Sequence, residues 1–242
     1  MKLRSLINIG LVCLSILSTT ACSGENDDSS KENYAKKYEN SDIGDVIEFG
    51  SYEQDNNKEN GLETIEWIVL AKEDDKLLVI SKYCLDVKAY NNENKDVTWE
   101  TCTIRKWLND NFYKMVFSKN EAEIILESEL TNPDNDEGYY DKGKGGNDTK
   151  DKVFLLSMEE VDKYIPTESD RITDATEYAR AQGEIFNFWD SGSGIPRWWL
   201  RSPGYDADYA SCVTEEGDVS KTGIYVEYDG LCIRPALWIN VK

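Results

Sequence analysis

The first part of the chain alternates between apolar and polar residues in the manner of β-strands. Residues 64–70 alternate and then become wholly apolar, as a strand does when it enters a core. Residues 77–80 return after the polar pair at 74–75, and residues 46–49 form a shorter apolar stretch before a glycine. The pattern therefore predicts an antiparallel sheet near the start of the folded part.

The middle of the chain changes to helical spacing. Between residues 104 and 116, apolar residues recur three or four positions apart, with charged residues on the opposite face. Two Ser-x-x-Glu capping boxes, at residues 118–121 and 157–160, predict where two further helices begin. A buried strand is expected at residues 153–156, and another helix at residues 174–182.

Beyond residue 198 the pattern is again that of strands. Asp229-Gly230 predicts a tight turn that pairs residues 224–226 with a last strand at residues 231–241. There is no internal repeat and no second linker. Strands at both ends with short helices between them predict an α+β fold in a single domain, residues 42–242, with antiparallel sheets and a few short helices packed on them.

Residues 1–22 are predicted to be a targeting segment and not part of the fold. Two positive residues precede an apolar stretch of secretory length, and residues 19–22 resemble the cleavage box of bacterial lipoproteins. An ordinary secretory peptide cut nearby is the alternative. We expect a lipid on Cys22, a disordered polar tether over residues 23–41, and anchoring to the outer face of a bacterial membrane, of the Gram-positive type.

Charge and the missing residue types narrow the functions. The formal net charge is −20 and no basic stripe interrupts it, so nucleic-acid binding is disfavoured, whereas cations and neutral sugars are tolerated. Histidine is absent, which excludes Ser-His-Asp and Cys-His nucleophiles and His-ligated zinc. Any catalysis would have to use carboxylates, Tyr, Lys, Arg or Cys.

Several short motifs, taken in order, resemble the bacterial domain of unknown function numbered 6273. They are FGSY at 49–52, VTWETCTIRKWLN at 97–109, DKVFLLS at 151–157, WWLRSPG at 198–204 and RPALW at 234–238. The resemblance spans about residues 43–240, and it departs at Glu53 and at Cys232, where that family often has proline and an apolar residue. Its closing strand is similar to the ends of C-type-lectin-like and formylglycine-generating-enzyme domains, which implies a lectin-like fold and a binding role. No catalytic residue is implied.

Tryptophan and arginine meet beside Pro-Gly and Pro-Ala breaks at residues 197–204 and 233–238. Two interpretations stay open. The side chains fill a core and hold strands together, or they form a platform for a sugar or peptide. In the second interpretation the loop after the Pro-Gly break supplies a polar rim. The candidate ligand-binding residues are Trp198, Trp199, Arg201, Tyr205, Asp206, Asp208, Tyr209 and Arg234.

Four cysteines remain beyond the expected lipid cysteine, and four cysteines permit three full pairings. Cys212 and Cys232 lie on strands that are expected to be adjacent, so we expect a disulfide between them. Cys84 and Cys102 would form the second pair. A redox-active thiol pair is the functional alternative.

The loop at residues 132–152 is long and rich in Asp, Asn and Gly, as functional or disordered loops are. Asp134, Asp136 and Gly138 resemble the opening of a calcium loop, but Gly145 stands where a bidentate glutamate is required. A solvated loop is the default interpretation, so no cofactor is expected, and calcium at Asp134 and Asp136 is the alternative.

The leading hypothesis is a cell-surface lipoprotein whose non-catalytic, lectin-like domain binds an extracellular glycan, peptide or other surface ligand. An enzyme of the formylglycine-generating type is the second hypothesis, and a structural envelope protein is the third. The expected partners are the membrane, through the lipid anchor, and an extracellular ligand, with no nucleic acid.

Overall fold

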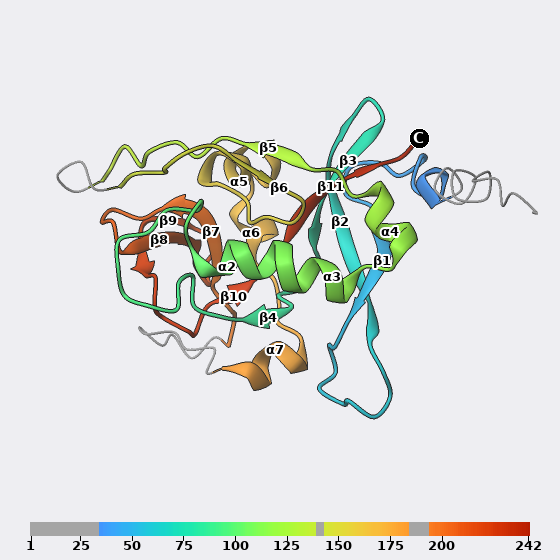
Figure 1. Cartoon of the computed structure of the whole chain (residues 1–242), viewed down its shortest axis with the longest axis horizontal. Coiled ribbons are helices and arrows are strands. Elements are labelled where there is room, and N and C mark those ends of the chain that lie inside the picture. Colours follow the sequence, from blue (N-terminus) through green and yellow to red (C-terminus); the bar gives the residue numbers. More distant parts are fainter. Residues whose placement is uncertain (1–33, 139–142, 184–193) are drawn as a thin grey trace, which may run out of the picture.

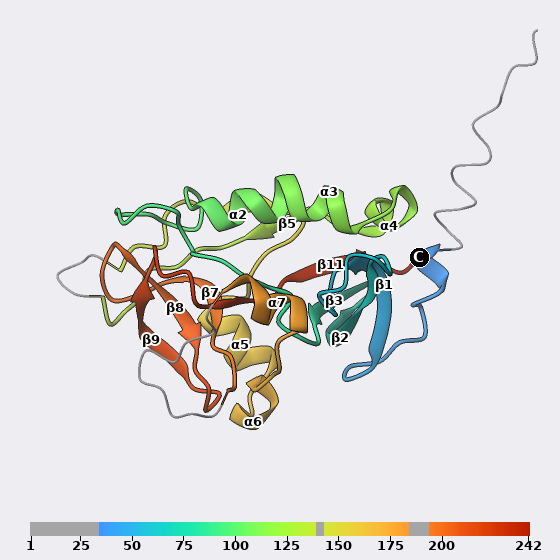
Figure 2. The ribbon, with the colours of Figure 1, turned by 90° about the horizontal axis from the view of Figure 1, so that it is seen from below.

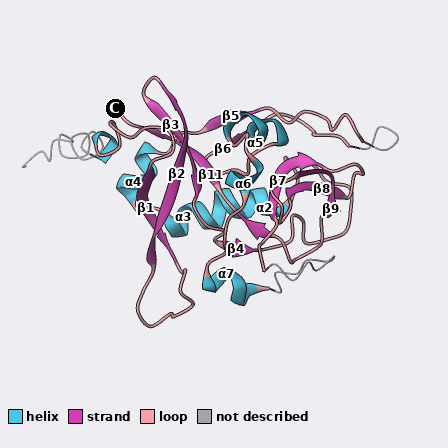
Figure 3. Cartoon of the chain, turned by 180° about the vertical axis from the view of Figure 1, so that it is seen from behind, coloured by secondary structure: helices cyan, strands magenta, loops and turns pink. Residues whose placement is uncertain are grey.

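The computed structural model describes residues 34–138, 143–183 and 194–242. Two groups of strands occupy the two ends of the molecule, and a row of helices runs along one side of both (Figures 1 and 2). Figure 3 shows the same two groups from behind, with further short helices around them. The predicted α+β class is confirmed.

The first sheet contains the hairpin that the alternating pattern predicts. Strands β2 and β3 pair antiparallel, with Ile68 opposite Ile80, and Asp74 makes the turn with a positive φ of 48°. The last strand of the chain, β11, pairs with β3, so the sheet order is β1-β2-β3-β11. These strands are β1 (Val46–Tyr52), β2 (Glu63–Glu73), β3 (Lys76–Ser81) and β11 (Ala236–Asn240).

The second sheet has the order β4-β10-β7-β8-β9, with β10 parallel to β7. The predicted hairpin across Asp229-Gly230 is wrong, because β9 pairs with β8 whereas β10 lies on the far side of β7. Beyond β9 the chain continues along the β8 side, since the Val226 N–H donates to the Asp208 carbonyl at 2.9 Å. The strands are β4 (Asp86–Val87), β7 (Trp198–Pro203), β8 (Tyr209–Val213), β9 (Val219–Tyr225) and β10 (Cys232–Ile233).

The expected helix at residues 104–116 is one continuous run with a π-helical middle. It consists of α2 (Thr103–Trp107), the π-helix η1 (Leu108–Phe112) and α3 (Tyr113–Val116). The next helix, α4 (Lys119–Ile124), begins at the predicted capping box of Ser118 and Glu121. The Glu121 carboxylate also accepts the Gly50 N–H at 2.8 Å, which ties the helical row to β1.

The remaining elements are short. The second predicted capping box, at Ser157 and Glu160, opens α5, as expected. The predicted strand at residues 153–156 is a buried segment that makes an isolated bridge between Phe154 and Ala236. The elements are β5 (Ser128–Leu130) paired with β6 (Thr149–Asp151), α5 (Met158–Tyr164), α6 (Glu168–Arg171) and α7 (Glu177–Gln182).

The buried apolar side chains of both sheets and of the helical row form one continuous cluster. This cluster begins earlier than predicted, because Ala35 and Tyr38 are buried and the Tyr38 hydroxyl donates to the Glu48 carbonyl at 2.9 Å. The expected disordered tether is therefore corrected for residues 34–41, which pack on the domain. Cys22 and residues 23–33 lie outside the described residues. Within the described ranges, no helix has the length and apolar character needed to cross a membrane.

Candidate functional site

The tryptophans of the WWLRSPG run lie in the core. Trp198 and Trp199 are buried on β7, and each indole N–H donates to a backbone carbonyl, at 3.2 Å to Arg171 and at 2.9 Å to Lys88. Both indoles therefore bury their apolar area while their polar atom stays paired. Neither ring leaves a face open to an external ligand. Of the two interpretations drawn from the sequence, the one in which these tryptophans fill the core is therefore correct.

The two arginines are equally buried. The Arg201 guanidinium pairs with Glu160 and donates to the Leu155 carbonyl at 3.0 Å. Arg234 donates to the Ser81 carbonyl at 3.0 Å and lies over the Trp198 ring, and its burial lowers its pKa to about 10. Of the two interpretations of these four tryptophan and arginine side chains, the ligand platform is therefore wrong, because they join β7 and β10 to their neighbours inside the protein.

The loop after the Pro-Gly break does reach a surface cleft. Tyr209 packs between Tyr205 and Tyr225, with ring-centroid distances of 4.8 and 4.2 Å. Asp206 holds the loop itself, because its carboxylate accepts the Ala207 N–H at 2.7 Å. Of the four loop residues that the sequence proposed, the structure places Tyr209 in the lining of the cleft. Tyr205 is its neighbour, and Asp208 contributes its backbone carbonyl to Val226.

This cleft, which we call the tyrosine cleft, has a volume of about 590 Å³. It lies beside β8 and β9 and the turn that follows them, and its described lining is mainly apolar. Tyr225 is 49% exposed, so part of its ring is open to solvent. The side chains that give the cleft its chemistry are Arg197, Tyr209, Tyr225, Glu227, Tyr228 and Asp229.

The cleft carries an excess of negative charge. Arg197 is paired with the buried Glu215, from its Nη2 to Oε1 at 2.9 Å, and this hydrogen bond lowers the pKa of Glu215. Glu227 and Asp229 are exposed and leave the mouth of the cleft negative. Burial, followed by hydrogen bonds with Tyr225 and Tyr205, raises the pKa of Tyr209, so its phenol is neutral at physiological pH.

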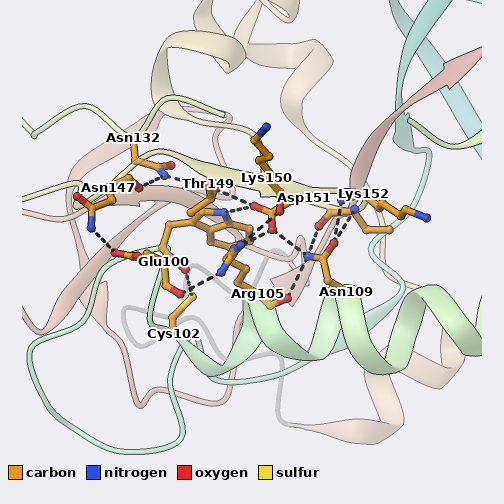
Figure 4. A network of polar contacts seen from close by, with 12 residues as sticks. Glu100, Cys102, Arg105, Asn109, Asn132, Asn147, Thr149, Lys150, Asp151 and Lys152 are labelled. Carbon is orange, nitrogen blue, oxygen red and sulfur yellow. Dashed lines mark hydrogen bonds and ion pairs between the residues drawn. The ribbon is translucent and has the colours of Figure 1, made fainter. Parts of the chain in front are cut away.

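A second polar cluster joins the VTWETCTIRKWLN and DKVFLLS motifs (Figure 4). Asp151, at the end of β6, accepts hydrogen bonds from Trp99 Nε1 at 2.9 Å, from Arg105 Nε at 2.7 Å and from the Thr149 hydroxyl at 2.9 Å. Sequence reasoning missed this cluster, because residues some fifty positions apart give no spacing signal. The one signal in the sequence that pointed to these residues was their place in the two family motifs.

Asn109 completes the same network from the π-helical turn. Its Oδ1 accepts the Lys152 N–H at 2.8 Å, and its Nδ2 donates to the Val153 carbonyl at 2.9 Å. A surface groove of about 630 Å³ runs beside the network and is lined by charges of both signs. Because Asp151 and Asn109 are bonded to neighbouring segments of the chain, the network holds the helical row against β6.

The comparison with known families confirms the resemblance carried by these motifs. The profile of the family described as Domain of unknown function (DUF6273) matches residues 74–241, which is more than half of the chain. The chain belongs to the DUF6273 family. No curated protein and no solved structure matches it. The matched region holds the polar network and the tyrosine cleft, and it leaves β1 and β2 outside.

The cysteines of this DUF6273 chain are arranged differently from the prediction. The expected Cys212–Cys232 disulfide is wrong, because β7 lies between their strands, with Trp199 opposite Cys212 and Trp198 opposite Cys232. Two strand spacings of about 4.8 Å each are too far for a disulfide. Cys232 instead neighbours Cys84, and Cys102 donates to the Trp99 carbonyl at 3.2 Å.

The four cysteines in the described ranges carry free, buried thiols. Burial raises the pKa of Cys102 and of Cys212 to about 12. A nucleophilic or redox-active cysteine needs an accessible thiolate, and these surroundings disfavour it. The geometry therefore gives no support to the hypothesis of a redox-active thiol pair.

The predicted calcium residues are paired with lysines. Asp134 binds Lys144 at 2.9 Å and accepts the Gly145 N–H at 3.0 Å, while Asp136 lies 3.5 Å from Lys221. Ammonium groups already occupy the positions that a cation would take. Within the described ranges, the group with metal-ligand spacing is Glu53, Asp55 and Glu63.

That acidic group lies where β1 and β2 separate, and it binds backbone amides. Glu53 accepts the Asn57 N–H at 2.9 Å, and Glu63 accepts the Gln54 N–H at 2.7 Å. These bonds account for the clustering of the carboxylates, since each one caps a turn of the loop.

Proposed function

We propose that the protein is a lipid-anchored cell-surface protein that binds a neutral or amino-substituted carbohydrate in the tyrosine cleft without catalysis. The observation that carries the proposal is the combination, in one cleft, of partly open tyrosine rings and exposed carboxylates. Ligand sites are concave and mainly apolar, with a few polar groups that fix orientation. The tyrosine cleft has that composition.

The chemistry of a sugar ring matches these groups. The apolar face of a pyranose stacks on an aromatic ring, and the half-exposed Tyr225 offers such a ring. Glu227 and Asp229 are acceptors at the mouth of the cleft and would bind sugar hydroxyls. The packing of Tyr209 between Tyr205 and Tyr225 keeps the aromatic surface in place without a ligand, which reduces the ordering cost of binding.

Charge restricts the ligand further. The cationic group in the described lining, Arg197, is already neutralised by Glu215, so the exposed carboxylates dominate. The whole chain adds a net charge of −20. An anionic polysaccharide would be repelled by both, whereas a neutral or amino sugar would not.

The same geometry gives less support to the hypothesis of a structural envelope protein than to the binding hypothesis. Trp198 and Trp199 serve the core, as a purely structural protein would require, but the residue before them, Arg197, lines an open cleft. A domain that only filled space in the envelope would have no use for that opening.

A binding experiment with the full chain tests the proposal. The chain is screened on an array of neutral, amino-substituted and acidic glycans, and the Kd of each hit is measured by calorimetry. We expect binding to neutral or amino sugars and a loss of about tenfold or more in Tyr225→Ala, because truncating an aromatic contact at the centre of a site costs at least about 1.4 kcal/mol.

Tyr83→Ala is the matched control, since Tyr83 is a half-buried tyrosine outside the cleft. It should bind as the wild type does. Unchanged binding in Tyr225→Ala, or binding restricted to acidic glycans, would overturn the proposal. Turnover of the bound glycan would instead favour an enzyme.

A further inference from the structure

A second cleft adjoins the tyrosine cleft. It has a volume of about 560 Å³ and is lined by residues of α2, of β4 and of the end of α7. Glu227 and Asp229 line both clefts, so the two openings lie side by side along one surface. We call the second one the amide cleft, because the exposed side chains of Asn92 and Gln182 belong to its described lining.

The border between the two clefts is held by backbone hydrogen bonds. The Lys88 N–H donates to the Leu231 carbonyl at 3.2 Å, and the Asn91 N–H donates to the Val226 carbonyl at 2.8 Å. The segment of the amide cleft before α2 therefore runs beside the turn that carries the two shared carboxylates. Their position relative to both clefts is set by the folded chain and does not depend on a ligand, which lowers the ordering cost of binding.

The amide cleft repeats the charge arrangement of the tyrosine cleft. Lys88 Nζ lies 3.2 Å from a carboxylate oxygen of the buried Asp86. In the tyrosine cleft, Arg197 is paired with the buried Glu215 in the same way. In both clefts the cation of the described lining is thus neutralised from inside the protein, and the two shared carboxylates, which are exposed, set the charge of the surface. One kind of ligand, neutral or amino-substituted, therefore suits both clefts.

The amide cleft offers hydrogen bonds more than aromatic surface. Asn92 and Gln182 each carry an amide, which supplies both donors and an acceptor to sugar hydroxyls. The Asn92 N–H is bonded to the Thr103 hydroxyl at 3.0 Å, which fixes the backbone of this residue. Trp107 also lines the cleft, but Lys88 Nζ lies 4.6 Å from its ring centroid and covers that face. A sugar ring in this cleft would be held through its hydroxyls, whereas a ring in the tyrosine cleft stacks on tyrosine.

We propose that the two clefts form one groove that binds a neutral or amino-substituted oligosaccharide of roughly three rings or more. The inference rests on the proposed function, because it takes the tyrosine cleft as the site of the first ring. A cleft of this size already holds a drug-sized molecule, so a short sugar fills the tyrosine cleft and a longer one continues past Glu227 and Asp229 into the amide cleft. The shared carboxylates accept hydrogen bonds from the rings that cross the border.

A length series tests this inference. Calorimetry measures the binding of the full chain to β-1,4-linked oligomers of glucose, of N-acetylglucosamine and of glucosamine, each from a single ring to four rings. We expect the Kd to fall by about tenfold or more between the single ring and the three-ring oligomer, because the amide cleft adds hydrogen bonds for the longer ligand alone. Tyr225→Ala should weaken binding at every length.

A double variant isolates the amide cleft. Asn92→Ala combined with Gln182→Ala should raise the Kd of the three-ring oligomer by about tenfold and leave the Kd of the single ring unchanged. Both side chains are exposed, so the variant should keep the fold, which near-ultraviolet circular dichroism checks. Asn94→Ala is the matched control, because Asn94 is an exposed asparagine close to Asn92 and outside the described lining of both clefts. It should bind as the wild type does.

The outcomes separate this inference from the proposed function. An equal Kd at every length, or an equal loss at every length in the double variant, would overturn the groove while leaving sugar binding in the tyrosine cleft. No binding to any oligomer of the series would overturn the groove as well. Combined with no binding of neutral or amino-substituted glycans on the array, it would also overturn the proposed function.

Discussion

Replacing Asp151 by alanine tests whether the polar network of Figure 4 holds the helical row against β6. The Asp151 side chain is 1% exposed and accepts hydrogen bonds from Trp99, Thr149 and Arg105. Alanine removes the acceptor for these three donors at once, and also for Asn109 Nδ2, which donates to Asp151 at 3.3 Å. The backbone pairing of β6 with β5 does not depend on the carboxylate, so the local fold can survive the change.

The size of the effect follows from what each donor can do afterwards. Trp99 Nε1 and the Thr149 hydroxyl are buried and would lose their acceptor, at about 1–3 kcal/mol each. Arg105 is 25% exposed and can turn toward water, so its loss adds less. We expect the free energy of unfolding to fall by about 4 kcal/mol.

Urea unfolding, followed by tryptophan fluorescence, measures this loss. The comparison requires that the slope of the free energy of unfolding against urea concentration is the same in both proteins. Glu129→Ala is the control on the neighbouring strand, because Glu129 faces solvent and its ion pair with Lys150 lies at the surface. Its unfolding midpoint should match that of the wild type. A loss of less than about 1 kcal/mol in Asp151→Ala would refute the reasoning, since no buried donor could then have been left unpaired.

Two further predictions concern the ion pair beside the cleft and the core. The hydrogen bond from Arg197 lowers the pKa of Glu215 below its ordinary 4.5, so its contribution to stability is present above about pH 4.5 and is lost as the pH falls through the lowered value. Between about pH 6 and pH 3 the wild type should lose more stability in urea than Glu215→Gln, and equal losses would contradict the assignment. Trp199→Ala should lower the free energy of unfolding by about 3–5 kcal/mol, measured by thermal denaturation, whereas Tyr225→Ala should stay near the wild type; similar stability of both variants would show that Trp199 is not a core residue.

Local patterns predicted a large part of the fold. The β2–β3 hairpin, the helical run from α2 to α3 and the capping boxes of α4 and α5 all match. Each depends on residues only a few positions apart, where periodicity and capping act directly. Pairing between distant strands carries no such signal. For this reason the hairpin expected across Asp229-Gly230 failed, as did the disulfide expected between the strands of Cys212 and Cys232.

The candidate site was predicted in part. The sequence pointed to the loop that contains Tyr209, but it left open whether Trp198 and Trp199 form an aromatic platform or fill the core, and both are buried. A tryptophan in an apolar strand looks the same in sequence whether its strand lies inside a sheet or at a surface. The strand order of the second sheet puts β7 between β10 and β8, and this placement made Trp198 and Trp199 part of the core.

By itself, the sequence determined the family, the α+β class and the acidic charge, because motifs, periodicity and composition are properties of neighbouring residues or of their sum. Only the tertiary structure decided which side chains meet. It brought Asp151 to Trp99, Arg201 to Glu160, and Tyr225 to Tyr209. Those contacts result from strand order and helix packing, which are set by burying one shared core and cannot be reduced to any short stretch of the chain.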